Sequence, residues 1–103
     1  MIKVSVFYPN EEGKSFDMQY YCAKHIPLVQ NCLGAALKNT AVEQGLGGAE
    51  PGSEASFTAM GHLYFDSVVD FQSSFGPHAE SIMGDIPNFT DIQPTIQISE
   101  VKM

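Results

Sequence analysis

The sequence of 103 residues predicts a single-domain α+β fold with the element order βαββαβ, the split-βαβ or ferredoxin-like arrangement. Three observations lead to this prediction. Four short stretches rich in β-branched and aromatic residues are typical of strands. Two stretches with helical spacing of apolar residues separate the first strand from the second and the third from the fourth. The strands also alternate between two unlike faces, which fits an antiparallel sheet with both helices on one side.

The first strand is expected over residues 2–8, because this stretch has strand composition and partial alternation. The first helix is expected from Phe16 to about His25. Ser15 is the predicted N-cap, and Asp17 lies in the first turn, where the helix dipole favours a negative charge.

This helix has two candidate faces. At 100° per residue, Phe16, Tyr20 and Ala23 share the face that we expect to pack on the sheet. Tyr21 and His25 are four residues apart and form a separate stripe with Asp17.

Pro27 is expected to kink or break the helix, since proline lacks an N–H donor and disfavours α geometry at Ile26. Helix is predicted to resume for one or two turns, and Gly34 is a plausible C-cap. Ser67 and Asp70 resemble a capping box at the start of the second helix, which Gly76-Pro77 interrupts. The other expected segments are a polar strand at 37–45, a loop at 45–56, strands at 57–66 and 94–102, and irregular chain at 84–93.

The predicted sheet has an apolar face and a mixed face. The apolar face is expected to receive the helices, and it carries Val4, Val6, Leu63, Phe65, Ile96 and Ile98. The mixed face carries Lys3, Ser5, Phe7, Thr58, Met60, His62, Tyr64, Thr95, Gln97 and Ser99. Because it is neither a dry core nor a charged surface, it predicts a homodimer in which two sheets close face to face around a semi-polar cavity. Such a dimer would also stabilise a chain that buries only about 65% of its unfolded surface.

Composition excludes several classes of function. The net charge of −7 disfavours nucleic acid and anionic membranes as partners. The apolar runs are too short to span a bilayer and no leader pattern is visible, so we expect a cytoplasmic protein. Cys22 and Cys32 lack any CxxC or Cys/His spacing and are expected to be buried free thiols. No metal site is predicted, because no HxH, HExxH or carboxylate cluster occurs.

His25 is the first candidate for chemistry, since an imidazole titrates near neutral pH and a helix end beside a break can aim it into a cleft. It could equally be a local cap at a helix C-terminus. His62 is the second candidate, beside Tyr64 on the mixed face, with a hydrogen-bonded structural histidine as the alternative. One of the adjacent Tyr20 and Tyr21 should pack on the sheet and leave the other free to offer its hydroxyl.

The chain resembles the EthD family of the dimeric α+β barrel superfamily over essentially its whole length. The most specific part is the pattern formed by Phe16, Asp17, Tyr20, His25, Pro27 and Leu28. The strands MIKVSVFYP and MGHLYFDS and the stretch FGPHAESIMGDIPNFTDIQP also carry the resemblance. It implies a ferredoxin-like subunit that dimerises through its sheet, and related barrels hold their ligands between helices and sheet. The family takes its name from an ether-degradation gene cluster built around a cytochrome P450 system.

We therefore hold two functional hypotheses. In the first, the chain is a cofactor-independent enzyme, isomerase-like, lyase-like or associated with an oxidoreductase, that acts on a small hydrophobic, oxygenated or aromatic compound. His25 and Tyr21 would be catalytic, and Phe7, Met60, His62 and Tyr64 would bind the substrate. In the second, the chain is a non-catalytic carrier or accessory protein of an oxygenase system. A third possibility, a purely structural dimer, predicts that no pocket of ligand size exists.

Overall fold

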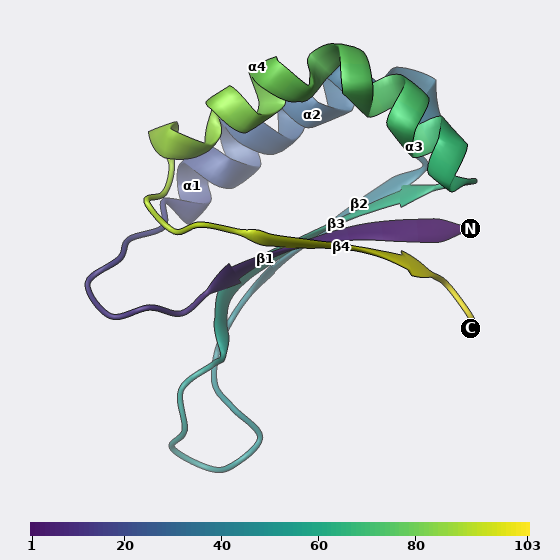
Figure 1. Cartoon of the computed structure of the whole chain (residues 1–103). Helices are drawn as coiled ribbons and strands as arrows, with labels where there is room; N and C mark the ends of the chain where they lie inside the picture. Colours follow the sequence, from purple (N-terminus) through teal and green to yellow (C-terminus); the bar gives the residue numbers. More distant parts are fainter.

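The computed structural model describes residues 1–103 and contains one antiparallel sheet with the helices on one side of it (Figure 1). The strand order is β2-β3-β1-β4, so the first strand lies in the middle. The predicted βαββαβ order and ferredoxin-like fold are confirmed, although the second and fourth strands are shorter than predicted. The strands are β1 (Ile2–Pro9), β2 (Asn39–Gln44), β3 (Phe57–Phe65) and β4 (Thr95–Glu100).

The first helical arm is continuous and consists of α1 (Met18–Tyr20), a π turn (Tyr21–His25), α2 (Ile26–Leu33) and a 3₁₀ turn (Gly34–Ala36). Its N-cap is Asp17, whose Oδ1 accepts the backbone N–H of Tyr20 at 3.0 Å. The prediction of Ser15 as N-cap is wrong, because the backbone of Ser15 is hydrogen-bonded to Thr90 and Asp91. Its N–H donates to Asp91 Oδ1 at 3.0 Å, and its carbonyl accepts the Thr90 hydroxyl at 2.6 Å.

Pro27 does not break this arm. Ile26 keeps α geometry, with φ −62° and ψ −43°, and its N–H bonds the carbonyl of Tyr21 five residues earlier. The irregularity is therefore a π turn immediately before the proline, where the sequence predicted a kink or break. A proline ring normally meets the carbonyl four residues earlier, and the wider turn accommodates it.

The face of the first arm that packs on the sheet is the stripe predicted to be separate. Tyr21 is 2% exposed and His25 is 5% exposed, and the buried Val29 and Leu33 continue the same spacing of four residues. Ala23, predicted to pack on the sheet, is exposed. Phe16 and Tyr20 are half-buried and do pack against the core. The prediction is wrong for Ala23, because the π turn at Tyr21–His25 departs from the spacing of 100° per residue.

The second helical arm consists of α3 (Val68–Phe75), a 3₁₀ turn (Gly76–His78), α4 (Ala79–Gly84) and a last 3₁₀ turn (Ile86–Asn88). The predicted cap is confirmed, since Ser67 Oγ accepts the N–H of Asp70 at 3.1 Å. Gly76-Pro77 changes the helix type without ending the arm. The stretch 84–93 was predicted to be irregular, but it carries this final turn, which positions Asp85 and Asn88.

The hydrophobic core lies between the helical arms and the predicted apolar face of the sheet. Val4, Leu63 and Phe65 pack with Val29 and Leu33 in one cluster. A second cluster is mainly aromatic and contains Tyr8, Tyr21, Ile26, Ala59, Phe89 and Ile92. Burial is incomplete at the β4 edge, where Ile96 and Ile98 are 46% and 44% exposed.

Both cysteines are free, but the prediction that they are buried is wrong for Cys22, which is exposed on the outer side of the first arm. Cys32 is half-buried. None of the helices has the length and apolar character needed to cross a membrane.

Candidate active site

A cavity of about 200 Å³ lies between the helical arms and the sheet. Of its 15 lining residues, 13 are hydrophobic. Met83 and Ile96 are the exposed members of the lining, at 41% and 46%, which places the mouth between α4 and β4. The lining residues are Val4, Val6, Tyr8, Tyr21, His25, Ile26, Val29, Gly61, Leu63, Phe71, Phe75, Ile82, Met83, Ile86 and Ile96.

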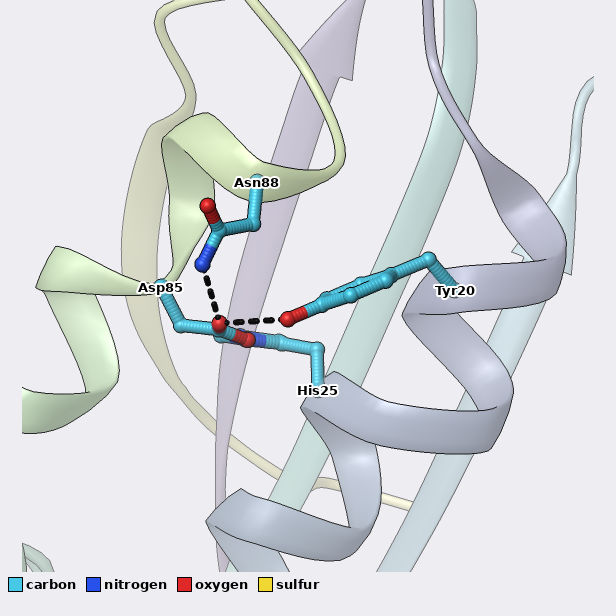
Figure 2. A network of polar contacts seen from close by, with 4 residues as sticks. All are labelled: Tyr20, His25, Asp85 and Asn88. Carbon is cyan, nitrogen blue, oxygen red and sulfur yellow. Dashed lines mark hydrogen bonds and ion pairs between the residues drawn. The ribbon is translucent and has the colours of Figure 1, made fainter.

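His25 brings an imidazole to the wall of this cavity, and Asp85 holds it there. His25 Nδ1 lies 2.9 Å from Asp85 Oδ2, and the two residues are 60 positions apart in the chain. The side chains are 6% and 13% exposed, so water screens the contact little. Figure 2 shows the two residues, with His25 on the first helical arm and Asp85 near the end of the second.

Asp85 accepts further hydrogen bonds at its other oxygen. The Tyr20 hydroxyl donates to Oδ1 at 2.8 Å, and Asn88 Nδ2 donates to the same atom at 2.9 Å (Figure 2). Burial alone would raise the pKa of Asp85, but the bonds from Asn88, His25 and Tyr20 outweigh it and hold the pKa below its usual value. The bond to Asp85 in turn raises the pKa of the Tyr20 hydroxyl. Both oxygens of the Asp85 carboxylate are therefore engaged in polar contacts.

The imidazole packs against two aromatic rings that also contact each other. The ring of Tyr21 lies nearly parallel to that of His25, at 17° with 5.5 Å between centres, and the Phe89 ring is 4.7 Å away. With Nδ1 engaged by Asp85, Nε2 has no hydrogen-bond partner within the protein. It is thus the nitrogen of His25 left for a molecule in the cavity.

The hydroxyl of the buried Tyr21 lies directly against the backbone of Gly61. A Cβ on Gly61, in the middle of β3, would collide with the Tyr21 hydroxyl. Burial raises the pKa of Tyr21 to about 12. Burial also raises the pKa of Tyr8, and the hydrogen bond to Tyr21 adds to that rise. Both hydroxyls therefore keep their protons at neutral pH and are not bases.

Of the six predicted site residues, only Tyr21 and His25 line this cavity. The other four, Phe7, Met60, His62 and Tyr64, lie on the opposite face of the sheet. The prediction that they share one pocket with His25 is wrong, because neighbouring positions on a strand point to opposite faces, and Gly61 and Leu63 are the residues of β3 that line the cavity.

His62 itself has structural partners. Its Nδ1 is 2.9 Å from Ser5 Oγ, and its Nε2 is 3.3 Å from Glu43 Oε1, which joins the three strands β1, β3 and β2. This is the hydrogen-bonded arrangement that was the alternative to a binding role.

Asp85 is the functional residue that sequence reasoning missed. It was assigned to an irregular stretch, and the carboxylate expected on the same helix stripe as His25 was Asp17. Nothing in the spacing connects positions 25 and 85, since only the fold brings the ends of the two arms together. No group of three or more potential metal-binding side chains comes together in the structure.

Comparison with known proteins gives consistent results at the level of family and fold. The model of the EthD domain matches residues 11–93. An EthD-like protein from Ralstonia eutropha has 45% identity and a TM-score of 0.95, over 99% of this chain and 92% of that one. An ethyl tert-butyl ether D (EthD) family protein from Bacillus halodurans has 23% identity and a TM-score of 0.75, over 99% of both chains.

A more distant neighbour shows the fold alone. It comes from Shewanella loihica, carries a provisional assignment as a monooxygenase, and has 10% identity and a TM-score of 0.60 over 99% of this chain and 94% of that one. No curated protein sequence matches the chain. The family match covers most of the sequence, including both His25 and Asp85, and the chain belongs to the EthD family.

Proposed function

We propose that this EthD-family protein binds a small apolar metabolite in the cavity between helices and sheet and moves a proton with His25. The observation that carries the proposal is the contact of 2.9 Å between His25 Nδ1 and Asp85 Oδ2 at the wall of an apolar cavity. A buried carboxylate that orients an imidazole and stabilises its charged form is a recurrent acid–base arrangement. Burial of two polar side chains costs free energy, and such a role gives a reason for that cost.

The arrangement supports proton abstraction followed by proton return. Nε2 would take a proton from a bound compound, and the resulting imidazolium would face the Asp85 carboxylate through Nδ1–H. If the proton then returns to a different atom of the compound, the reaction is an isomerisation. If proton abstraction leads to cleavage of a bond in the compound, the reaction is that of a lyase. A supporting role in an oxidative degradation pathway would use the same step on an oxygenated or aromatic intermediate.

The second candidate function is binding without chemistry, as a carrier or accessory of an oxygenase system. One observation favours it. His25 is the only imidazole in a lining that contains no carboxylate or amine, and burial raises the pKa of Tyr8 and Tyr21. A cavity with one proton-exchanging group can select a ligand without converting it.

We also propose a homodimer in which the outer face of the sheet meets that of a second copy. Phe7, Met60 and Tyr64 support it, because they are large side chains that stay half-exposed on a face no helix covers. His62, buried beside them, would lie within the interface.

The test is a screen of small oxygenated aromatic and alicyclic compounds against the protein and its His25→Ala variant. Enzyme function predicts product formation by the protein and a loss of at least about 100-fold in the variant, the usual scale of an acid–base residue. Carrier function predicts thermal stabilisation by the ligand without product. Turnover that survives the substitution would remove His25 from the mechanism. Sedimentation as a stable monomer of 11.2 kDa would remove the homodimer.

A further inference from the structure

The volume of the cavity suits a ligand of about one ring. Cavities of about 150 Å³ hold benzene, and this one measures about 200 Å³. A six-membered ring with one or two small substituents fits within it. The apolar lining, which includes Phe71 and Phe75, suits the faces and edges of such a ring.

The charge around the cavity excludes an anion. All five cationic side chains of the protein are lysines, and none of them lines the cavity. Asp85 does not line the cavity, but its negative charge lies next to it, in contact with the lining residue His25. A carboxylate or phosphate entering here would lose its hydration, find no cation and meet a negative charge.

The hydrogen bonds of His25 define which polar group the ligand carries. An ionised carboxylate only accepts hydrogen bonds, so Asp85 fixes the imidazole proton on Nδ1. In the neutral ring, Nε2 then has a free lone pair and is an acceptor. A ligand that binds the neutral ring must therefore donate a hydrogen bond at this point, and an ether or ketone would not meet that requirement.

We infer that the ligand is a neutral monocyclic compound with a weakly acidic hydroxyl group, a phenol or an enol, whose O–H donates to Nε2 of His25.

The ligand enters the cavity with its hydroxyl group leading. His25 is buried, at 5% exposed, whereas the exposed lining residues Met83 and Ile96 are at the mouth. Transfer of that proton breaks the ligand O–H bond, forms Nε2–H and leaves an enolate or phenolate beside an imidazolium that Asp85 stabilises. This inference rests on the proposed function and specifies its ligand.

The experiment compares four probes that share one methyl-substituted ring, near pH 7: 4-methylphenol, toluene, 4-methylanisole and 4-methylbenzoate. Each is titrated while the methyl signals of Ile82 and Met83 and the ring nitrogens of His25 are followed by NMR. We expect 4-methylphenol to bind about tenfold more tightly than toluene or 4-methylanisole, the scale of one hydrogen bond, and to shift Nε2. We expect no binding of 4-methylbenzoate.

Two results would overturn the inference. If toluene or 4-methylanisole matches 4-methylphenol, or 4-methylbenzoate binds as well, the cavity receives ligands but the hydroxyl class is wrong. If none of the four probes perturbs Ile82, Met83 or His25, the inference and the proposed function both fail. The His25→Ala variant should bind toluene and 4-methylphenol equally. The nitrogen shifts of the unmodified protein provide the same information should that variant fail to fold.

Discussion

The Tyr21 hydroxyl occupies the place where a side chain at position 61 would begin. A glycine in the middle of a strand normally weakens the strand, since it costs conformational entropy and leaves nothing to pack. Here it allows an aromatic ring from the first helical arm to reach the backbone of β3. That ring is one of the two aromatic rings against which the imidazole of His25 packs.

We expect Gly61→Ala to lower the free energy of unfolding by about 1–3 kcal/mol, as for overpacking of a core. Tyr21→Phe should relieve this, because the next atom that the new methyl group meets is Tyr21 Cζ at 3.4 Å, an ordinary contact. Urea denaturation of the two single variants and the double variant checks the coupling. Strictly additive effects would contradict the contact.

Asp85→Asn should destabilise the protein by about 1–3 kcal/mol near neutral pH, because an amide nitrogen then faces either His25 or the donors Tyr20 and Asn88. It should also weaken binding of any ligand that donates to Nε2, since the tautomer of His25 is no longer fixed. Asp91→Asn is the matched control, because Asp91 accepts a backbone N–H from Ser15 and does not line the cavity. It should change stability and leave ligand affinity as it is.

The stability of the protein should fall in acid partly because of Asp85. Its folded pKa lies below the value of 3.8 expected in the unfolded chain, so its contribution is present above that value. The contribution is lost as the pH falls through the folded pKa. Unfolding free energies of the protein and of Asp85→Asn should therefore converge below about pH 4. A difference that stays constant down to pH 2 would contradict this assignment.

Phe89→Ala should cost about 3–5 kcal/mol, because the ring is 3% exposed and packs against Tyr8, Tyr21 and His25. Against a typical total of about 5–15 kcal/mol, this variant is close to unfolding. Phe89→Leu keeps most of the volume and should cost about 1 kcal/mol. Thermal denaturation ranks the two variants, and equal losses would contradict a packing role.

Phe7→Asp tests the proposed dimer without touching the cavity. A charge placed on the uncovered face of the sheet should shift sedimentation at micromolar concentration from dimer to monomer. The affinity for ring probes in the cavity should stay unchanged, since Phe7 lies on the other side of the sheet. Loss of probe binding in a well-folded monomer would show that the two faces are coupled.

The fold was predictable because each strand and helix has a local signature. Residues 2–8 alternate, Ser67 has a hydroxyl that caps a helix, and residues 57–66 combine β-branched and aromatic side chains, so local chemistry determined most boundaries. Where the prediction failed, the cause was not local. Ser15 has an ideal cap hydroxyl, but Thr90 and Asp91 hold it in an extended segment, and the helix begins later.

The site was only half predictable for the same reason. His25 was visible as a titratable group beside a proline, and Tyr21 as its neighbour on the helix. Asp85 could not be found, because its role depends on where the second arm ends relative to the first. The residues of the mixed face of the sheet were identified correctly, but they were assigned to the same pocket as His25. Strand alternation places them on the other side of the sheet.

The π turn at Tyr21–His25 has a consequence for comparing sequences. A π turn is one residue longer than the α turn that it replaces, so it behaves as a one-residue insertion absorbed within a helix. Removing one residue from Tyr21–His25 would regularise the helix and leave both of its ends where they are. Deleting one residue between Tyr21 and His25 would place Tyr20, in the position now held by Tyr21, four residues before the histidine. An alignment gap in this turn would record a change in the cavity wall rather than in the fold.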